Sequence, residues 1–208
     1  MNNRAKGDRY YGKKAERYET RRKKQAWWHV EQNEMRDLLS GLPNGLSVID
    51  IPFGTGRFVP YYLEKNFKVA GLDASQDMIE SARNILGDDI DRCETRVGSA
   101  MDLPYEDNEF DLLVSTRFLR DIIVFGDAKR ALNEFVRVTR QFLIIQLGEA
   151  ISGGRTPSDD ETWGSSMSSE ANEALLKDVG LEILDKRLVK NDAEENSHIH
   201  HVLCRKMT

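Results

Sequence analysis

The chain has 208 residues and a net charge of −5, and 39% of its residues are hydrophobic and 31% charged. A chain of this length and composition can bury a sizeable core, which argues against an intrinsically disordered segment or a scaffold that depends on disulfides. The longest stretch without a charge, 38–49, is too short to span a membrane, and the first residues lack the apolar segment of a secretory signal. We therefore expect a cytoplasmic protein without membrane insertion.

The N-terminal part of the chain is basic. Residues 1–24 contain ten Lys or Arg and three Asp or Glu, whereas the remaining residues contain 20 and 32. Residues 14–39 contain no Pro or Gly and favour one or two helices that end at Gly41. We therefore divide the chain into a basic helical arm, 1–40, and a domain, 41–208. Such an arm can engage an anionic partner such as nucleic acid, although a solvated helix face explains the same charges.

Apolar strands and amphipathic helices then alternate along the chain. Because the strands are apolar on both faces, they indicate a parallel sheet covered by helices, which is an α/β fold. The connection 190–197 is too short for a helical crossover, so the last two strands should form an antiparallel hairpin. The predicted strands are 46–51, 67–72, 95–98, 110–115, 142–147, 181–189 and 199–205, and the predicted helices after the arm are 57–66, 75–86, 127–138 and 169–179.

The first predicted strand leads into a glycine turn with the sequence DIPFGTGR, 50–57. In open α/β sheets the ligand binds beyond the carboxyl ends of the strands, so this turn is a candidate site. Gly54 and Gly56 can adopt positive φ and let a ligand approach the backbone closely. A dinucleotide fingerprint would need a third glycine where Val59 stands, and the Gly-Lys-Ser/Thr of a phosphate-binding loop is also absent. The turn therefore disfavours a phosphate ligand.

Two carboxylates stand at the ends of the first two strands. Asp50 precedes the glycines, and Asp73 ends the second strand, where a carboxylate can accept hydrogen bonds from both hydroxyls of a ribose. A ligand with a ribose and a cationic end but no phosphate satisfies both positions, and S-adenosylmethionine is such a ligand. The alternative roles are a turn cap for Asp50 and an acid at a helix N-terminus for Asp73.

Four segments carry a resemblance to a known family. The segments VIDIPFGTGRF (48–58), GLDASQDMIESAR (71–83), GSAMDLPYEDNEFDLLVS (98–115) and NEFVRVT (133–139) resemble, in this order and at these spacings, small class I S-adenosylmethionine-dependent methyltransferases. The resemblance implies a Rossmann-like seven-stranded sheet of order 3-2-1-4-5-7-6, with strand 7 antiparallel and helices on both faces. It also implies S-adenosylmethionine as the cofactor and methyl transfer as the activity.

The resemblance further implies which residues bind the cofactor. Asp50 and the two glycines would line its methionine end, Asp73 would hold the ribose, and Ala74 and Met78 would pack near the adenine. The implied cofactor-binding residues are Asp50, Pro52, Gly54, Gly56, Asp73, Ala74, Met78, Ser99, Ala100 and Ser115.

This sequence departs from the family pattern at three positions. Ser99 stands where the family often has an acid that contacts the adenine amino group, and Pro52 and Phe53 replace the commoner Gly and Cys. We expect none of these residues to place a bulky side chain where the two glycines of the turn must be open.

The segment after the fourth strand, STRFLRD (115–121), is where the methyl acceptor is usually recognised in the resembled family. It lacks both the Asp/Asn-Pro-Pro-Tyr/Phe motif for nucleobase amino groups and a Pro-Cys nucleophile, which favours a small-molecule acceptor over nucleic acid. Arg117 would favour a carboxylate or phosphate on that acceptor, or would instead pair with Asp121 four residues on. Trp28 is a second candidate for acceptor binding.

No residue is assigned as a general base, because methyl transfer from a sulfonium mainly requires alignment and desolvation of the reactants. No metal is expected either. His198 and His200 share one face of a strand while His201 points to the other, and Cys93 and Cys204 form no CxxC pattern. We interpret these side chains as structural.

The hypothesis from the sequence is methyl transfer from S-adenosylmethionine to a small, anionic acceptor. One alternative is methylation of RNA or protein guided by the basic arm, and another is a non-catalytic cofactor-binding or interaction protein with the same fold. In the resembled family the segment before the first strand commonly covers the cofactor. We therefore expect residues 18–29 to lie across the open end of the sheet as a lid.

Overall fold

The computed structural model describes residues 12–119, 125–154, 167–194 and 196–207. These residues divide into two compact units, one within residues 1–104 and the other within 105–208. The strands form one seven-stranded sheet of order β3-β2-β1-β4-β5-β7-β6, which confirms the predicted fold and strand order. Within the described residues, no helix is long and apolar enough to cross a membrane.

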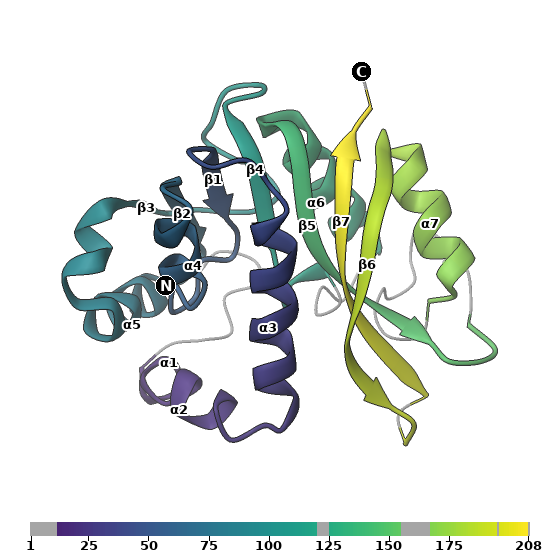
Figure 1. The fold of residues 1–208 in the computed structure, drawn as a ribbon, viewed down its shortest axis with the longest axis horizontal. Coiled ribbons are helices and arrows are strands. Elements are labelled where there is room, and N and C mark those ends of the chain that lie inside the picture. Colours follow the sequence, from purple (N-terminus) through teal and green to yellow (C-terminus); the bar gives the residue numbers. More distant parts are fainter. Residues whose placement is uncertain (1–11, 120–124, 155–166, 195, 208) are drawn as a thin grey trace, which may run out of the picture. The chain divides into compact units, whose positions relative to one another are not determined.

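The first unit contains three parallel strands and most of the helices (Figure 1). Ser75 begins α5 by accepting a hydrogen bond from the Met78 amide, as expected for a serine at a helix start, and Pro60 stands in the first turn of α4. The elements are α1 (Lys13–Glu16), α2 (Tyr18–Arg22), α3 (Trp27–Ser40), β1 (Ser47–Asp50), α4 (Val59–Glu64), β2 (Lys68–Asp73), α5 (Gln76–Leu86), the 3₁₀ helix η1 (Gly87–Arg92) and β3 (Cys93–Val97).

The second unit contains the antiparallel part of the sheet. β4 and β5 are parallel, whereas β7 pairs antiparallel with both β5 and β6, which confirms the predicted hairpin. β5 is longer than predicted, because its pairing with β7 continues to Ala150. The elements are β4 (Phe110–Ser115), α6 (Phe125–Val138), β5 (Thr139–Ala150), α7 (Ser169–Asp178), β6 (Leu181–Asp192) and β7 (Ser197–Lys206).

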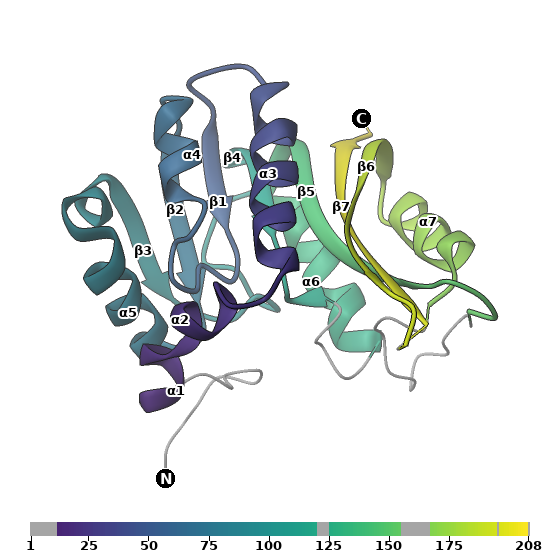
Figure 2. The same cartoon turned by 60° about the horizontal axis from the view of Figure 1, so that its bottom comes forward.

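Within the described residues, the arm forms three helices instead of one or two. The break between α2 and α3, 23–26, includes Lys23 and Lys24 of the cationic run 21–24, and like charges three or four residues apart disfavour a continuous helix. Figures 1 and 2 both show α1 and α2 beyond the end of β1 that leads into the glycine turn. The arm is therefore placed to contact that turn.

Candidate functional site

The glycine turn joins β1 to α4. Gly54 and Gly56 both have positive φ, at 58° and 65°, as predicted. A Cβ added to Gly54 would meet only Met78 Cε, at 3.6 Å, whereas one added to Gly56 would lie 2.6 Å from Leu86 Cδ1 and 3.0 Å from Phe53 Cζ. Gly54 thus leaves space beside the backbone. At Gly56 that space is filled from within the protein, so the expectation that Phe53 crowds neither glycine is wrong.

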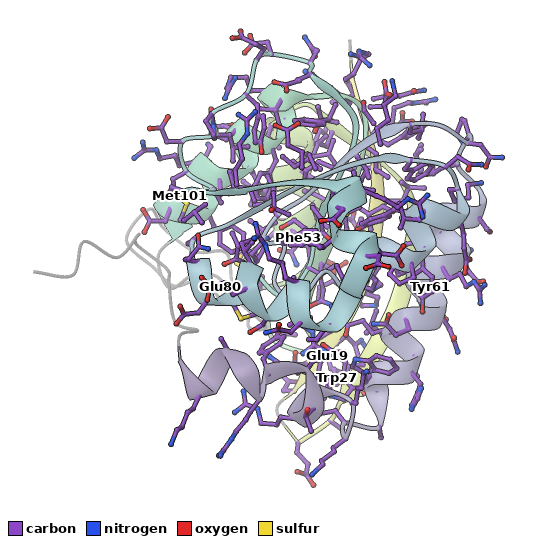
Figure 3. All side chains as sticks on the ribbon, turned by 90° about the vertical axis from the view of Figure 1, so that its left-hand side faces the viewer. Glu19, Trp27, Phe53, Tyr61, Glu80 and Met101 are labelled. Atoms are coloured by element: carbon purple, nitrogen blue, oxygen red, sulfur yellow. The ribbon has the colours of Figure 1, made fainter. Side chains whose placement is uncertain are left out.

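Phe53 itself is wedged against β2. Its ring is 3% exposed, and a Cβ on Gly71 would lie 2.1 Å from Phe53 Cδ2. Figure 3 shows the labelled Phe53 side chain inside the molecule, whereas Glu80 projects outward from α5. Because β2 has no side chain at Gly71, the ring packs directly on the strand, and the Phe53 amide donates to the Leu72 carbonyl at 2.8 Å. This packing fixes the first half of the glycine turn.

Asp73 connects the end of β2 to the turn. Its Oδ2 accepts a hydrogen bond from the Gly54 amide at 2.8 Å, and its Oδ1 accepts one from the Ser75 amide at 2.9 Å. Asp73 therefore stabilises the turn by bridging the amides of Gly54 and Ser75.

Asp50 ends β1 in a buried environment. Its side chain is 3% exposed, and the Tyr62 hydroxyl on α4 donates a hydrogen bond to its Oδ2 at 3.1 Å. Burial raises the pKa of the Asp50 carboxyl to about 8, although the Tyr62 hydrogen bond and the Arg57 charge lower it, and the nearby Asp73 raises it further. The carboxyl is thus an acid that is held protonated near neutral pH.

The arm contacts the glycine turn through two polar pairs. The Thr55 hydroxyl donates to Glu19 Oε2 at 3.1 Å, and Arg57 pairs with Glu31 of α3 at 2.5 Å. Glu19 and Thr55 are both almost completely buried. Since Thr55 stands between the two glycines, α2 lies directly on the turn.

The other expected residues of this unit lie around the same turn or after β3. Pro52 and Ala74 are partly exposed, and Ala100 is 7% exposed. Ser99 Oγ accepts a hydrogen bond from the Met101 amide at 3.2 Å. The Trp28 ring, half buried, packs edge-on against His29 in the arm, with ring centroids 4.9 Å apart.

Three polar residues of the second unit lie close together: Ser115 ends β4, Arg117 follows it, and Gln146 lies within β5. Ser115 is 1% exposed, and its hydroxyl has no hydrogen-bond partner among the described residues. Arg117 is buried with φ of 55°, and its amide donates to Gln146 Oε1 at 3.2 Å. The alternative partner of Arg117, Asp121, lies outside the described residues.

The C-terminal histidines lie in a buried polar cluster on β7. His200 Nδ1 is 3.4 Å from a Glu149 oxygen, and Lys186 Nζ is 2.6 Å from the other oxygen of the same carboxylate. Burial lowers the pKa of His200 to about 4, so this ring is neutral at pH 7. His201 is fully buried. Within the described residues, no group of three or more His, Cys, Asp or Glu is placed to hold a metal ion.

The site residues that were not predicted from the sequence include Glu19, Thr55 and Tyr62. The contact between Glu19 and Thr55 joins positions 36 apart in the chain, and no local pattern marks it. Tyr62 did leave a signal, because it follows Val59 by three residues and therefore shares the buried face of α4.

Residues 49–142 match the family described as methyltransferase domain. They include the glycine turn, both strand-end carboxylates and the segment after β4. Residues 49–142 thus match a methyltransferase domain, in agreement with the resemblance that the sequence motifs carry.

Curated relatives of this methyltransferase domain include demethylmenaquinone methyltransferases. The protein from Renibacterium salmoninarum is 33% identical over 104 residues, which cover 50% of this chain and 40% of the relative. The match thus spans less than half the length of that relative.

Two solved structures show the same fold. The 4+2 cyclase SpnF has a TM-score of 0.70 at 19% identity, and the match covers 89% of this chain and 84% of the cyclase chain. The Burkholderia thailandensis 1,6-didemethyltoxoflavin N1-methyltransferase, solved with 1,6-didemethyltoxoflavin and S-adenosylhomocysteine, has a TM-score of 0.69 at 16% identity, with coverages of 92% and 84%.

Proposed function

We propose that the chain transfers a methyl group from S-adenosylmethionine to a small, anionic acceptor. The observation that carries this proposal is the pairing of Gly54 with Asp73. The glycine is open on one side with positive φ, and its amide donates a hydrogen bond to Asp73, the carboxylate at the end of β2. This arrangement suits a ligand that presents a ribose and has no phosphate.

The chain's own residues would bind and orient the cofactor. Asp73 would accept hydrogen bonds from the ribose hydroxyls, Gly54 would allow the methionine end close to the backbone, and Asp50 would offset its positive charge. Ala74, Met78, Ser99 and Ala100 would border the adenine. The cofactor supplies a methyl group already activated by its sulfonium, so the protein has to align the reactants and exclude water.

The acceptor would be recognised by residues of the second unit. Arg117 brings a buried guanidinium to the end of β4, and a buried guanidinium favours a planar anion such as a carboxylate. The Ser115 hydroxyl, which has no partner among the described residues, is a further group that a ligand would satisfy. The names of the curated relatives make demethylmenaquinone, which is a quinone, one acceptor to try first.

The experiment is a transfer assay with isotopically labelled S-adenosylmethionine and a panel of small carboxylates, phenols and quinones, with products detected by mass spectrometry. We expect label in at least one anionic acceptor, and Arg117→Lys should raise the KM for that acceptor about tenfold or more, because the bidentate geometry of the guanidinium is lost. Label in RNA or protein only would show the proposed substrate class to be wrong.

A second candidate is a cofactor-binding protein that does not transfer methyl groups. The similarity to SpnF supports this candidate, since SpnF has this fold and is named a cyclase, not a methyltransferase. Such a protein would bind S-adenosylmethionine and consume none of it in the presence of its substrate. Measuring S-adenosylhomocysteine formation in the same assay distinguishes the two functions.

A further inference from the structure

A buried acid and a buried phenol stand together beside the glycine turn. Asp50 at the end of β1 is 3% exposed, Tyr62 on α4 is fully buried, and the Tyr62 hydroxyl donates to one oxygen of the Asp50 carboxyl at 3.1 Å. A carboxylate buried with one neutral donor is poorly solvated, so its neutral form is favoured.

Among the described residues, the groups around Asp50 supply no strong counter-ion. Arg57, the last residue of the turn, attracts the Asp50 charge but is itself paired with Glu31 at 2.5 Å. Asp73 on β2 repels the Asp50 charge, and Cys93 on β3 also interacts with it. A positive ligand at the turn would therefore be the charge that ionises Asp50.

We propose that Asp50 and Tyr62 form a proton-linked site for the cationic end of the cofactor, in which the Asp50 carboxyl is protonated in the empty protein and releases its proton when the cofactor binds. This inference rests on the proposed cofactor. The Asp50 O–H bond breaks, the proton goes to solvent, and the resulting carboxylate faces the positive charge of the ligand. Tyr62 is a positioning residue, because its hydroxyl donates to the carboxyl oxygen and stabilises the ionised form.

One consequence is that cofactor affinity depends on pH. When binding releases one proton, the dissociation constant of the cofactor falls about tenfold for each unit by which the pH rises, as long as the acid is protonated in the empty protein. Because burial raises the pKa of Asp50 to about 8, this dependence of affinity on pH is expected below pH 8. An α-amino group has a pKa of roughly 7.7–8.0, so between about pH 6 and 7 the cofactor stays mostly cationic and contributes little to this slope.

The test is calorimetry of S-adenosylmethionine binding at about pH 6.5, in buffers of different ionisation enthalpy, which counts the protons released. We expect the wild type to release about one proton per cofactor and Asp50→Asn to release none. In Tyr62→Phe the proton should still be released, with cofactor affinity reduced about three- to tenfold, because the ionised carboxyl loses a donor. Tyr61→Phe, next to it on the half-exposed side of α4, should bind like the wild type.

Infrared difference spectra provide a second measurement on the wild type alone. Adding cofactor should remove the carbonyl band of a protonated carboxyl, so the test does not depend on Asp50→Asn being folded. Cofactor binding with no proton release and no loss of this band overturns the inference and leaves the proposed function intact. No cofactor binding by the wild type overturns both.

Discussion

Asp73 has a structural role in the turn, and we propose a ligand-binding role for the same carboxylate. Its two oxygens already accept the amides of Gly54 and Ser75, so removing the side chain would disturb the turn as well as the ligand. Asn keeps the size of Asp and one acceptor oxygen but loses the charge. This makes Asp73→Asn a better probe of the ligand than Asp73→Ala.

We expect Asp73→Asn to weaken S-adenosylmethionine binding by about 1.5–3 kcal/mol, the range for a hydrogen bond to a charged group. Titration calorimetry measures the difference, and Asp91→Asn, an exposed carboxylate in η1, serves as the control. Equal affinity of a folded Asp73→Asn protein and the wild type would remove the ribose role from Asp73.

Asp50 should make stability depend on pH even without cofactor. Its pKa is raised from 3.8 to about 8 in the folded chain, so between these values the folded state holds a proton that the unfolded state has lost. Stability therefore falls as pH rises through this range. The unfolding free energy of the wild type relative to Asp50→Asn should decrease from about pH 5 to about pH 8 in urea titrations.

The control for this series is Asp37→Asn, because Asp37 is exposed on α3. The difference in unfolding free energy between Asp37→Asn and the wild type should stay nearly constant over the same pH range. A wild type whose stability relative to Asp50→Asn does not change between these pH values would contradict the assigned burial of the acid.

At this scale, the types and positions of residues were predictable and their partners were not. Asp50 and Asp73 were chosen as candidates because strand ends in α/β sheets often carry ligand residues. The hydrogen bonds from Tyr62 and from the Gly54 amide depend on how α4 and β2 pack, which no local spacing encodes. The crowding of Gly56 was missed for the same reason, since Phe53 folds back toward it.

Among the elements, β2 and the glycine turn depend on each other through Phe53 and Gly71. Ala at position 71 would place its Cβ 2.1 Å from the ring, so the ring must shift. Gly71→Ala should lower the unfolding free energy by about 1–3 kcal/mol, the usual cost of overpacking, and Phe53→Leu should restore part of the loss in the double variant.

Chemical denaturation of the two single variants and the double variant measures this coupling. Gly41→Ala is the matched control, because its Cβ would lie at an ordinary 3.6 Å from the nearest atom. Additive effects of Gly71→Ala and Phe53→Leu would show that the ring does not pack on β2 as described.

The arm is the second element with a testable role. Since Glu19 of α2 is hydrogen-bonded to Thr55 inside the glycine turn, cofactor binding should order this segment further. Amide hydrogen exchange should slow across residues 18–29 when S-adenosylmethionine is added, and Thr55→Val should reduce that protection. If the cofactor adds no protection there, the arm does not act as a lid.

Most elements were predictable because alternating apolar runs and amphipathic helices are local patterns. The strands before the tail and the closing hairpin followed from these patterns. The continuation of β5 to Ala150 was not predictable, because it requires β7, which lies more than 40 residues later, to pair beside it. The three-helix arm was also missed, since the charge run that interrupts it also suits an exposed helix.

For the whole molecule, the fold restricts the reaction without deciding it. The strand order and the domain match agree with cofactor-dependent methyl transfer, and proteins with this fold also include a cyclase. The cofactor was predictable because the residues proposed to bind it lie in short consecutive motifs. For the acceptor, the sequence offered Arg117 and Trp28 as candidate contacts, and an anionic acceptor stays a prediction.

The central claim is that the glycine turn binds S-adenosylmethionine, and the most direct test is calorimetry with the wild type, Gly54→Val and Gly87→Val. Both glycines have nearly the same positive φ, 58° and 57°, so valine strains the backbone at either position, but Gly87 is in η1 with open space around it. We predict one cofactor bound per wild-type chain, retained binding in Gly87→Val, and lost binding in Gly54→Val when both variants are folded. Equal binding by all three proteins, or no binding by the wild type, would contradict the account.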